Sequence, residues 1–309
     1  MFDAGSAAEA AFRRYEAVRG RMPVASFPAA SRHLADLGQA ADHYDGFILD
    51  AFGVLNVGET AIPGAVARMA ALRARGKRLV VLTNAASYTR AQILAKYHRL
   101  GFDFLASEVV TSRDVAVTRL EGVAPGATWA AISAEGDRFD DIPARVMDAV
   151  EDPGALDRAD AILFLSTGRW TPQIQVHLHR ALERRPRPFV VANPDIVAPR
   201  ETDLSQEPGL FAHGLIDALG CEVHWFGKPF AEGFADATLR TGLPAHRLAM
   251  VGDTLHTDVL GGAAAGCGTV LITDHGLFRG LDVGPFIAAS GTMPDAAMNG
   301  PTSSPRNGP

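Results

Sequence analysis

The chain has 309 residues, of which 47% are hydrophobic, so it is long enough for one large domain or two ordinary ones and too apolar to be disordered. Its 29 lysines and arginines against 35 acidic residues give a formal net charge of −6, which, without a dense basic run, argues against nucleic acid as the main partner. No apolar run approaches the roughly 20 residues of a membrane span. Cys221 and Cys267 lack metal-type spacing, and we expect a cytoplasmic protein with free thiols that binds neither nucleic acid nor membrane.

The two ends of the chain differ from the rest. The stretch from Ala7 to Val18 is alanine-rich with interspersed arginines, and it lacks the apolar core and cleavage site of a secretory signal. We predict that residues 1–31 form a helical arm that packs on the body or on a second subunit, or that frays. Residues 290–309 are rich in Gly, Pro, Ser and Asn, and we predict a disordered tail there.

From Asp45 onward, short β-branched or leucine-rich runs alternate with helical stretches, the pattern of a parallel sheet with crossover helices in an α/β fold. The predicted elements up to residue 124 are strands at 47–49, 78–84 and 109–112 and helices at 64–75 and 89–101. A second α/β set follows at 125–223, with strands at 128–133, 161–167 and 189–192 and a helix at 171–184. The first pattern then resumes with strands at 222–226, 247–251 and 269–273 and helices at 231–241 and from Asp258.

Two strand ends carry residues that suit nucleophilic attack on phosphorus. The first strand delivers Asp50 to its C-terminal tip, where open α/β sheets bind ligands, and its carboxylate could form an aspartyl-phosphate that water then cleaves. The next strand ends in Thr83 and Asn84. The Thr83 hydroxyl, with the amides of Asn84 and Ala85, could bind phosphoryl oxygens. A strand-end aspartate commonly only caps a turn, so the assignment depends on the order of several segments.

Two later segments supply charge. Lys228 lies in a Gly-Lys-Pro turn and could neutralise a phosphate, while Asp253 ends a further strand. Asp50 and Asp253 together could hold Mg²⁺, which prefers hard oxygen ligands and octahedral geometry. Asp258 follows five residues later. It either orients a metal-bound water or Lys228, or caps the helix that begins there, and the sequence leaves both roles open.

In this order the four segments resemble the motifs of the haloacid dehalogenase superfamily of aspartate-nucleophile hydrolases, from about residue 32 to residue 275. The segment GETAIPGA at 58–65 and the mid-chain Asn193-Pro194-Asp195 resemble the class II branch, whose members are mostly phosphatases. The resemblance implies a Rossmann-like doubly wound core at 32–124 and 224–289, with an inserted α/β cap at 125–223 that selects the substrate.

The resemblance also implies several site features. It adds the backbone carbonyl of Phe52 as a third metal ligand, and it places Asn193 and Asp195 on a cap loop whose polar groups face the leaving group. The same Asn-Pro-Asp stretch also suits a simple Asx turn. Class II relatives often pair through the cap, so a homodimer is possible.

One position departs from the superfamily pattern. Most of its phosphatases carry, two residues beyond the nucleophile, a second aspartate that protonates the leaving oxygen and later deprotonates the attacking water. This chain has Phe52 there, and general acid–base assistance is typically worth about 10²- to 10⁴-fold.

Three interpretations of the chain follow. The leading one is a Mg²⁺-dependent hydrolase of a small phosphorylated metabolite that is slow, prefers good leaving groups, or borrows His256 or a cap residue as the acid. The second is a metal-independent carbon–halogen hydrolase, since the superfamily's dehalogenases carry an aromatic residue at this position. The third is a non-catalytic protein that binds a phosphate ligand. Arg169 and Trp170 could contact substrate, although such a pair more often stacks at the surface.

Overall fold

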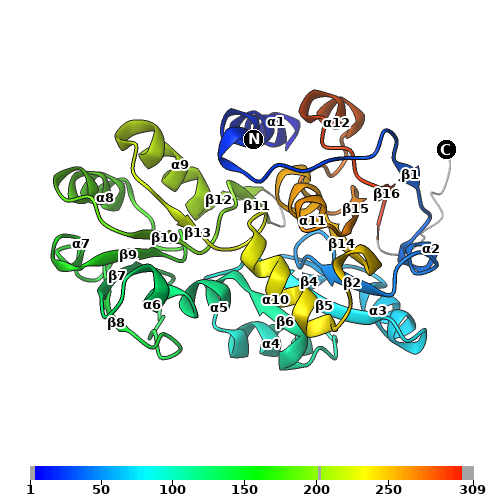
Figure 1. Ribbon diagram of the computed structural model, residues 1–309, viewed down its shortest axis with the longest axis horizontal. Coiled ribbons are helices and arrows are strands. Elements are labelled where there is room, and N and C mark those ends of the chain that lie inside the picture. Colours follow the sequence, from blue (N-terminus) through cyan, green and yellow to red (C-terminus); the bar gives the residue numbers. More distant parts are fainter. Residues whose placement is uncertain (1–3, 201–202, 301–309) are drawn as a thin grey trace.

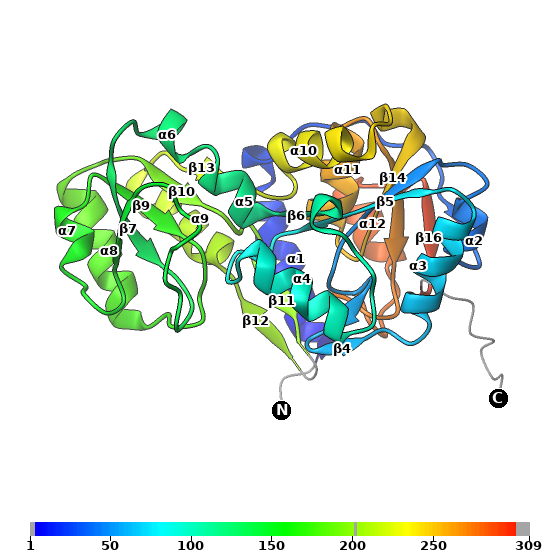
Figure 2. The same cartoon turned by 90° about the horizontal axis from the view of Figure 1, so that it is seen from below.

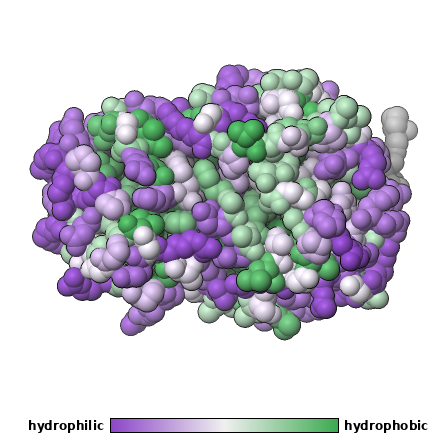
Figure 3. All heavy atoms as spheres, viewed as in Figure 1, coloured by the Kyte–Doolittle hydropathy of each residue, from purple (hydrophilic) through white to green (hydrophobic). Residues whose placement is uncertain are grey.

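The computed structural model describes residues 4–200 and 203–300, which form two α/β lobes side by side (Figures 1 and 2). In Figure 3 the outer ends of one face are mainly hydrophilic, and the more apolar residues lie nearer its middle. Within the described ranges, no helix has both the length and the apolar character to cross a bilayer.

The larger lobe is built on a parallel seven-stranded sheet with the order β1-β16-β15-β14-β2-β5-β6. From β2 the chain proceeds to β5 and β6 on one side and later to β14, β15 and β16 on the other. The carboxyl end of β2 is therefore a topological switch point, where open α/β sheets bind ligands. The strands are β1 (Arg32–His33), β2 (Gly46–Leu49), β5 (Arg78–Thr83), β6 (Val109–Thr111), β14 (Leu248–Gly252), β15 (Gly268–Ile272) and β16 (Ala296–Met298).

Helices cover both faces of this sheet because side chains alternate along each strand. Phe47 and Leu49 of β2 pack in one cluster with α2, α3 and α4, whereas Ile48 packs in another with α5 and α10. This arrangement confirms the predicted doubly wound α/β core. The helices of the lobe are α2 (Leu37–Ala40), α3 (Ala65–Ala74), α4 (Arg90–Arg99), α5 (Ser112–Val117), α10 (Ala231–Thr241), α11 (Leu260–Ala264) and α12 (Gly284–Ser290).

Short elements complete the larger lobe. A small antiparallel hairpin, β3 (Asn56–Val57) and β4 (Thr60–Ala61), follows the turn after Asp50. A π-helical turn (Leu255–Val259) precedes α11, and 3₁₀ turns occupy Ala106–Glu108 and Ala245–Arg247.

The second lobe has its own parallel sheet, with the order β13-β10-β9-β7-β8. An antiparallel hairpin of β11 and β12 extends from it toward the larger lobe (Figure 2). Its strands are β7 (Thr128–Ile132), β8 (Arg145–Asp148), β9 (Ala161–Phe164), β10 (Phe189–Val191), β11 (Val197–Pro199), β12 (Leu204–Gln206) and β13 (His224–Trp225). Its helices are α6 (Leu120–Val123), α7 (Ala155–Arg158), α8 (Pro172–Arg184) and α9 (Pro208–Leu219).

Two predictions about domain membership were wrong. The strand expected at 222–226 was assigned to the larger lobe, but β13 pairs with β10 in the second sheet. The tail predicted from residue 290 is ordered as far as residue 300, because β16 is inserted between β1 and β15. Residues 301–309, the rest of that predicted tail, lie outside the described residues.

The N-terminal arm is the helix α1 (Ala4–Ala17) followed by a 3₁₀ turn (Arg19–Arg21), and it bridges the two lobes. Arg14 pairs with Asp217 of α9 at 2.6 Å, and the Tyr15 hydroxyl accepts a hydrogen bond from the backbone amide of Ile196 at 3.0 Å. On the other side, Glu16 lies 2.5 Å from His256 of the larger lobe. Part of the predicted arm therefore packs on the body, and it ties the second lobe to the first.

Candidate active site

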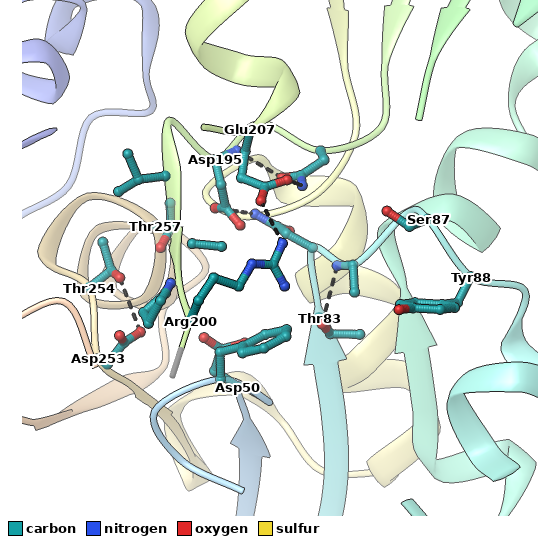
Figure 4. Close-up of a pocket in the computed structure, with 17 residues that line it drawn as sticks. Asp50, Thr83, Ser87, Tyr88, Asp195, Arg200, Glu207, Asp253, Thr254 and Thr257 are labelled. Atoms are coloured by element: carbon teal, nitrogen blue, oxygen red, sulfur yellow. Dashed lines mark hydrogen bonds and ion pairs between the residues drawn. The ribbon is translucent and has the colours of Figure 1, made fainter. Parts of the chain in front are cut away.

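The site lies where the carboxyl ends of three central strands meet the second lobe. Asp50 follows β2, Thr83 ends β5 and Asp253 follows β14, and all three side chains line one pocket with residues of the second lobe. Figure 4 shows Asp50 and Thr83 on the strand side and Asp195 and Glu207 on the opposite side. Strand ends that are about 30 to 200 residues apart in sequence converge because parallel strands all end at the same edge of the sheet.

Three buried carboxylates, Asp50, Asp253 and Asp258, crowd at the bottom of the site, with oxygen atoms within 4.8 Å of one another. Lys228 is 2% exposed, and its ammonium group lies 2.6 Å from Asp50 Oδ1 and 2.7 Å from Asp258 Oδ1. Burial lowers the pKa of Lys228, but the carboxylates of Asp258, Asp50 and Asp195 outweigh burial and raise it. Lys228 therefore stays charged, and the cluster keeps an excess of acids over cations.

The pKa values of the two strand-end aspartates are raised. Burial is the main cause for Asp50, to which the neighbouring carboxylates of Asp258 and Asp253 add, while Lys228 opposes the shift. For Asp253, burial and then Asp258 raise the pKa to about 6. Buried carboxylates whose negative charge is only partly neutralised by a neighbouring lysine favour the binding of a cation.

Asp258 is held by both of its oxygens. Oδ1 accepts from Lys228, and Oδ2 accepts from the backbone amides of Asp253 and Thr254 at 3.1 and 3.0 Å. The sequence left open whether Asp258 orients Lys228 or caps the helix that begins there. It holds Lys228, and it is not a helix N-cap, because it lies inside a π-helical turn and accepts from the amides of residues that precede it. A side chain at Gly252 would overlap Asp258, because its Cβ would lie 2.1 Å from Cγ, so this close packing requires glycine there.

The side chain of Asn84 links the two lobes rather than pointing freely into the pocket. Its Oδ1 accepts from the backbone amide of Lys228 at 2.7 Å, and its Nδ2 donates to the Lys228 carbonyl at 3.0 Å and to Asp195 Oδ1 at 2.8 Å. Thr83 is buried, and its Oγ1 accepts from the amide of Ala85 at 3.2 Å. The predicted phosphate-binding strand end is thus adjacent to both the lysine turn and the loop of the second lobe.

The Asn-Pro-Asp loop reaches the pocket and also forms the turn that its sequence suggests. Asn193 Oδ1 accepts from the amide of Asp195 at 3.0 Å, and its Nδ2 donates to Glu207 Oε2 at 3.0 Å. Asp195 lines the pocket. Burial raises the pKa of Asp195 to about 7, although Lys228 and the hydrogen bond from Asn84 act in the other direction.

Phe52 lines the same pocket, and two cations lie near its ring. Lys96 Nζ is 5.3 Å and Arg200 Cζ is 5.7 Å from the ring centroid, within the usual range of cation–π contacts. Arg200 also pairs with Glu207 Oε1 at 3.0 Å. Sequence reasoning missed Arg200, which follows β11, and Glu207, which follows β12, because they belong to no motif.

Three residues considered from sequence lie outside the pocket. His256 is buried, stacks on Tyr15 with centroids 4.9 Å apart and bonds to Glu16, so its suggested role as the acid is wrong. Its partners are about 240 positions away in sequence, and no local pattern indicates them. Arg169 pairs with Asp148 at 2.6 Å, and Trp170 stacks on Phe164, so each has a partner other than the one that the alternative of an Arg–Trp stacking pair predicted.

Comparison with known proteins shows the family to which the chain belongs. Residues 47–140 match a model described as haloacid dehalogenase-like hydrolase, and residues 225–284 match one described as HAD-like hydrolase. Human glycerol-3-phosphate phosphatase is 31% identical over 260 residues, which cover 74% of this chain and 78% of the relative. The chain belongs to the haloacid dehalogenase-like hydrolases.

Two solved structures of this family are similar to the chain. A possible sugar phosphatase from Cytophaga hutchinsonii superposes with a TM-score of 0.78 at 25% identity, covering 89% of this chain and all of the other. A glycerol phosphate phosphatase from Mycobacterium tuberculosis, in complex with magnesium, has a TM-score of 0.62 at 27% identity, covering 76% of this chain and 69% of the other. The protein is a phosphatase of phosphoric monoesters, which the comparisons favour over the carbon–halogen and non-catalytic alternatives.

Proposed function

We propose that the protein is a Mg²⁺-dependent phosphatase that hydrolyses a small phosphorylated metabolite through an aspartyl-phosphate on Asp50. The observation that carries the proposal is the position of Asp50. Its carboxylate lies at the topological switch point, 2.6 Å from Lys228 and within a cluster of buried carboxylates. A nucleophile beside fixed positive charge at the carboxyl edge of the sheet suits attack on an anionic phosphate.

The residues present fit a divalent cation. Asp50 and Asp253, with the backbone carbonyl of Phe52, would hold it, and the three-carboxylate cluster has only Lys228 as an adjacent cation among the described residues. The magnesium complex of the related mycobacterial phosphatase supports the choice of metal. When bound, the ion would neutralise charge so that an anionic nucleophile can approach an anionic phosphate. Asp258 would act indirectly, by holding Lys228 and the backbone at Asp253.

The chain's own groups account for the other steps. The Asp50 carboxylate attacks phosphorus, and Lys228 and Thr83 stabilise the phosphoryl oxygens through charge and hydrogen bonding. Water then cleaves the acyl phosphate and regenerates Asp50. The second lobe closes the pocket through Asn193 and Asp195, which would contact the part of the substrate beyond the phosphate. The specificity of the enzyme would therefore depend on this lobe.

The test is phosphate release from p-nitrophenyl phosphate and a panel of small phosphomonoesters, with Mg²⁺ and with EDTA, by wild type and Asp50→Asn. We expect metal-dependent release that Asp50→Asn abolishes. Asp253→Asn should raise the Mg²⁺ concentration needed for half-maximal rate. Equal release by wild type and Asp50→Asn would refute the mechanism. Halide release from 2-haloacids, measured alongside, would refute the substrate class if it proceeded without metal.

A further inference from the structure

Phe52 leaves the nucleophile without a neighbouring acid, and the structure offers a replacement on the other side of the pocket. We propose that Asp195, on the loop of the second lobe, donates a proton to the leaving oxygen and then takes a proton from the attacking water. This inference rests on the proposed function and names the acid–base residue of that reaction.

Asp195 lines the pocket from the second lobe, and Figure 4 shows it opposite Asp50. In phosphoryl transfer the attacking and leaving oxygens lie roughly in line, so a group facing the nucleophile across the pocket lies on the leaving-group side. Asn84 anchors Asp195 there through the 2.8 Å hydrogen bond to Oδ1, and the same Asn84 fixes the backbone of Lys228. The acid is thereby linked to the lysine that faces the nucleophile.

The other carboxylates that line the pocket already have partners or roles. Glu207 accepts from Arg200 and Ser205 at Oε1 and from Asn193 at Oε2, so both of its oxygens are used. Asp253 accepts from the Leu277 amide and from the Thr254 hydroxyl and belongs to the metal cluster. Asp50 is the nucleophile. Among the described residues that line the pocket, Asp195 is the carboxyl left for proton transfer.

The surroundings of Asp195 also suit a group that gives and takes a proton. Burial is the main cause that raises its pKa to about 7, and the charges of Glu207 and Asp258 act in the same direction, against Lys228 and Asn84. Tyr15 also faces Asp195, and it is held neutral because burial raises its pKa further above the ordinary value. A pKa near the working pH is what a group needs in order to give and take a proton in one cycle.

The loop that carries Asp195 is also held firmly. The preceding Asn193 forms its turn, and the following amide, Ile196, donates to the Tyr15 hydroxyl at 3.0 Å. A Cβ at Gly209 would lie 2.0 Å from the Pro194 carbonyl oxygen, so α9 packs directly against the loop. A proton donor must be positioned to within a fraction of an ångström, and these contacts supply that rigidity.

Asp195 gives up its proton in the first step of the reaction and regains one in the second. As Asp50 Oδ bonds to phosphorus, the bond from phosphorus to the leaving oxygen breaks, and the electron pair left on that oxygen takes the proton of the Asp195 carboxyl. The alcohol leaves and Asp195 remains as a carboxylate. That carboxylate then removes a proton from the water that attacks phosphorus, the bond to Asp50 breaks, and inorganic phosphate leaves. Asp50 is again a carboxylate and Asp195 again an acid.

The experiment compares an alkyl phosphate, glycerol phosphate, with p-nitrophenyl phosphate, whose leaving group is acidic enough to depart unprotonated. Wild type, Asp195→Asn and the control Glu207→Gln are assayed for kcat and KM. Asparagine keeps the oxygen that accepts from Asn84, so the loop retains its anchor. We expect Asp195→Asn to lower kcat on the alkyl phosphate by about 10²- to 10⁴-fold. The factor by which kcat falls on the aryl phosphate should be at least tenfold smaller. Glu207→Gln should change both rates by a similar factor.

The pH profile supplies a readout that a structural role would not change. In wild type, kcat on the alkyl phosphate should fall as pH rises through about 7, because the proton is lost from Asp195. Asp195→Asn should lack this limb, and adding Phe52→Asp to it should recover part of the alkyl rate. An equal loss on both substrates, or an unchanged pH limb in Asp195→Asn, would overturn the proposal. Absence of Asp50-dependent phosphate release in wild type would instead overturn the proposed function, and this inference with it.

Discussion

Mg²⁺ should stabilise the protein measurably, because its site holds more negative charge than the chain compensates. Three carboxylates lie within 4.8 Å of one another, and Lys228 is the cation bonded to two of them. A ligand that binds only the folded state stabilises it by RT ln(1 + [L]/Kd), about 2.7 kcal/mol at 100 times Kd. The entropy of unfolding is about 2.1 cal/mol/K per residue, so for 309 residues each kcal/mol corresponds to roughly 1.5 °C. We therefore expect saturating Mg²⁺ to raise the melting temperature by roughly 4 °C.

The assay is thermal denaturation in EDTA and at increasing Mg²⁺, with wild type, Asp253→Asn and Asp195→Asn. Asp253→Asn removes a proposed ligand and should lose most of the shift. Asp195→Asn removes a pocket carboxylate outside the cluster and should keep it. Carboxylates must be deprotonated to bind a metal, and burial raises the pKa of Asp253 to about 6. The rise in melting temperature caused by Mg²⁺ should therefore be smaller at pH 5.5 than at pH 7.5. An equal shift in wild type and Asp253→Asn would refute the assignment of the metal site.

Three further predictions concern turnover and stability. Asp50→Asn should abolish phosphate release with an unchanged circular dichroism spectrum; retained turnover would contradict a nucleophilic role. Arg113 is fully buried and binds Asp137 and Asp141, so Arg113→Ala should lower the free energy of unfolding in urea by about 3–5 kcal/mol, and a loss below about 1 kcal/mol would contradict this reasoning. Burial lowers the pKa of His213 to about 4; stability should therefore fall by about 3 kcal/mol from pH 7 to 4, and in His213→Phe the fall should be smaller.

The core of the fold and the strand-end residues could be predicted because both depend on local patterns. Buried strands have continuous apolar sequences, and the side chain that follows such a sequence lies at the carboxyl edge of a parallel sheet. Asp50, Thr83 and Asp253 meet in one pocket for that reason. Capping is equally local: Thr89 begins α4 with the predicted N-cap, and its side chain accepts from the amide of Gln92.

The wrong predictions concern partners that are distant in sequence. The strand β13 has two residues, and its composition does not show which of two sheets it joins. β16 lies in a segment rich in Gly, Pro and Asn, but its pairing with β1 and β15 orders it. His256 was misassigned for the same reason, since its buried neighbours come from α1. In each case a tertiary contact outweighs the local preference.

An acid on the second lobe has a consequence that an acid beside the nucleophile lacks. If Asp195 donates the proton, transfer requires the two lobes to be in contact, and the Asn84–Asp195 hydrogen bond is part of that contact. The contacts of α1 with both lobes, through Arg14 and Tyr15 on one side and Glu16 on the other, would hold this arrangement. An aspartate at position 52, in the larger lobe, would act whether or not the second lobe were in place. Because Phe52 occupies that position, protonation of the leaving group requires the second lobe to close over the substrate.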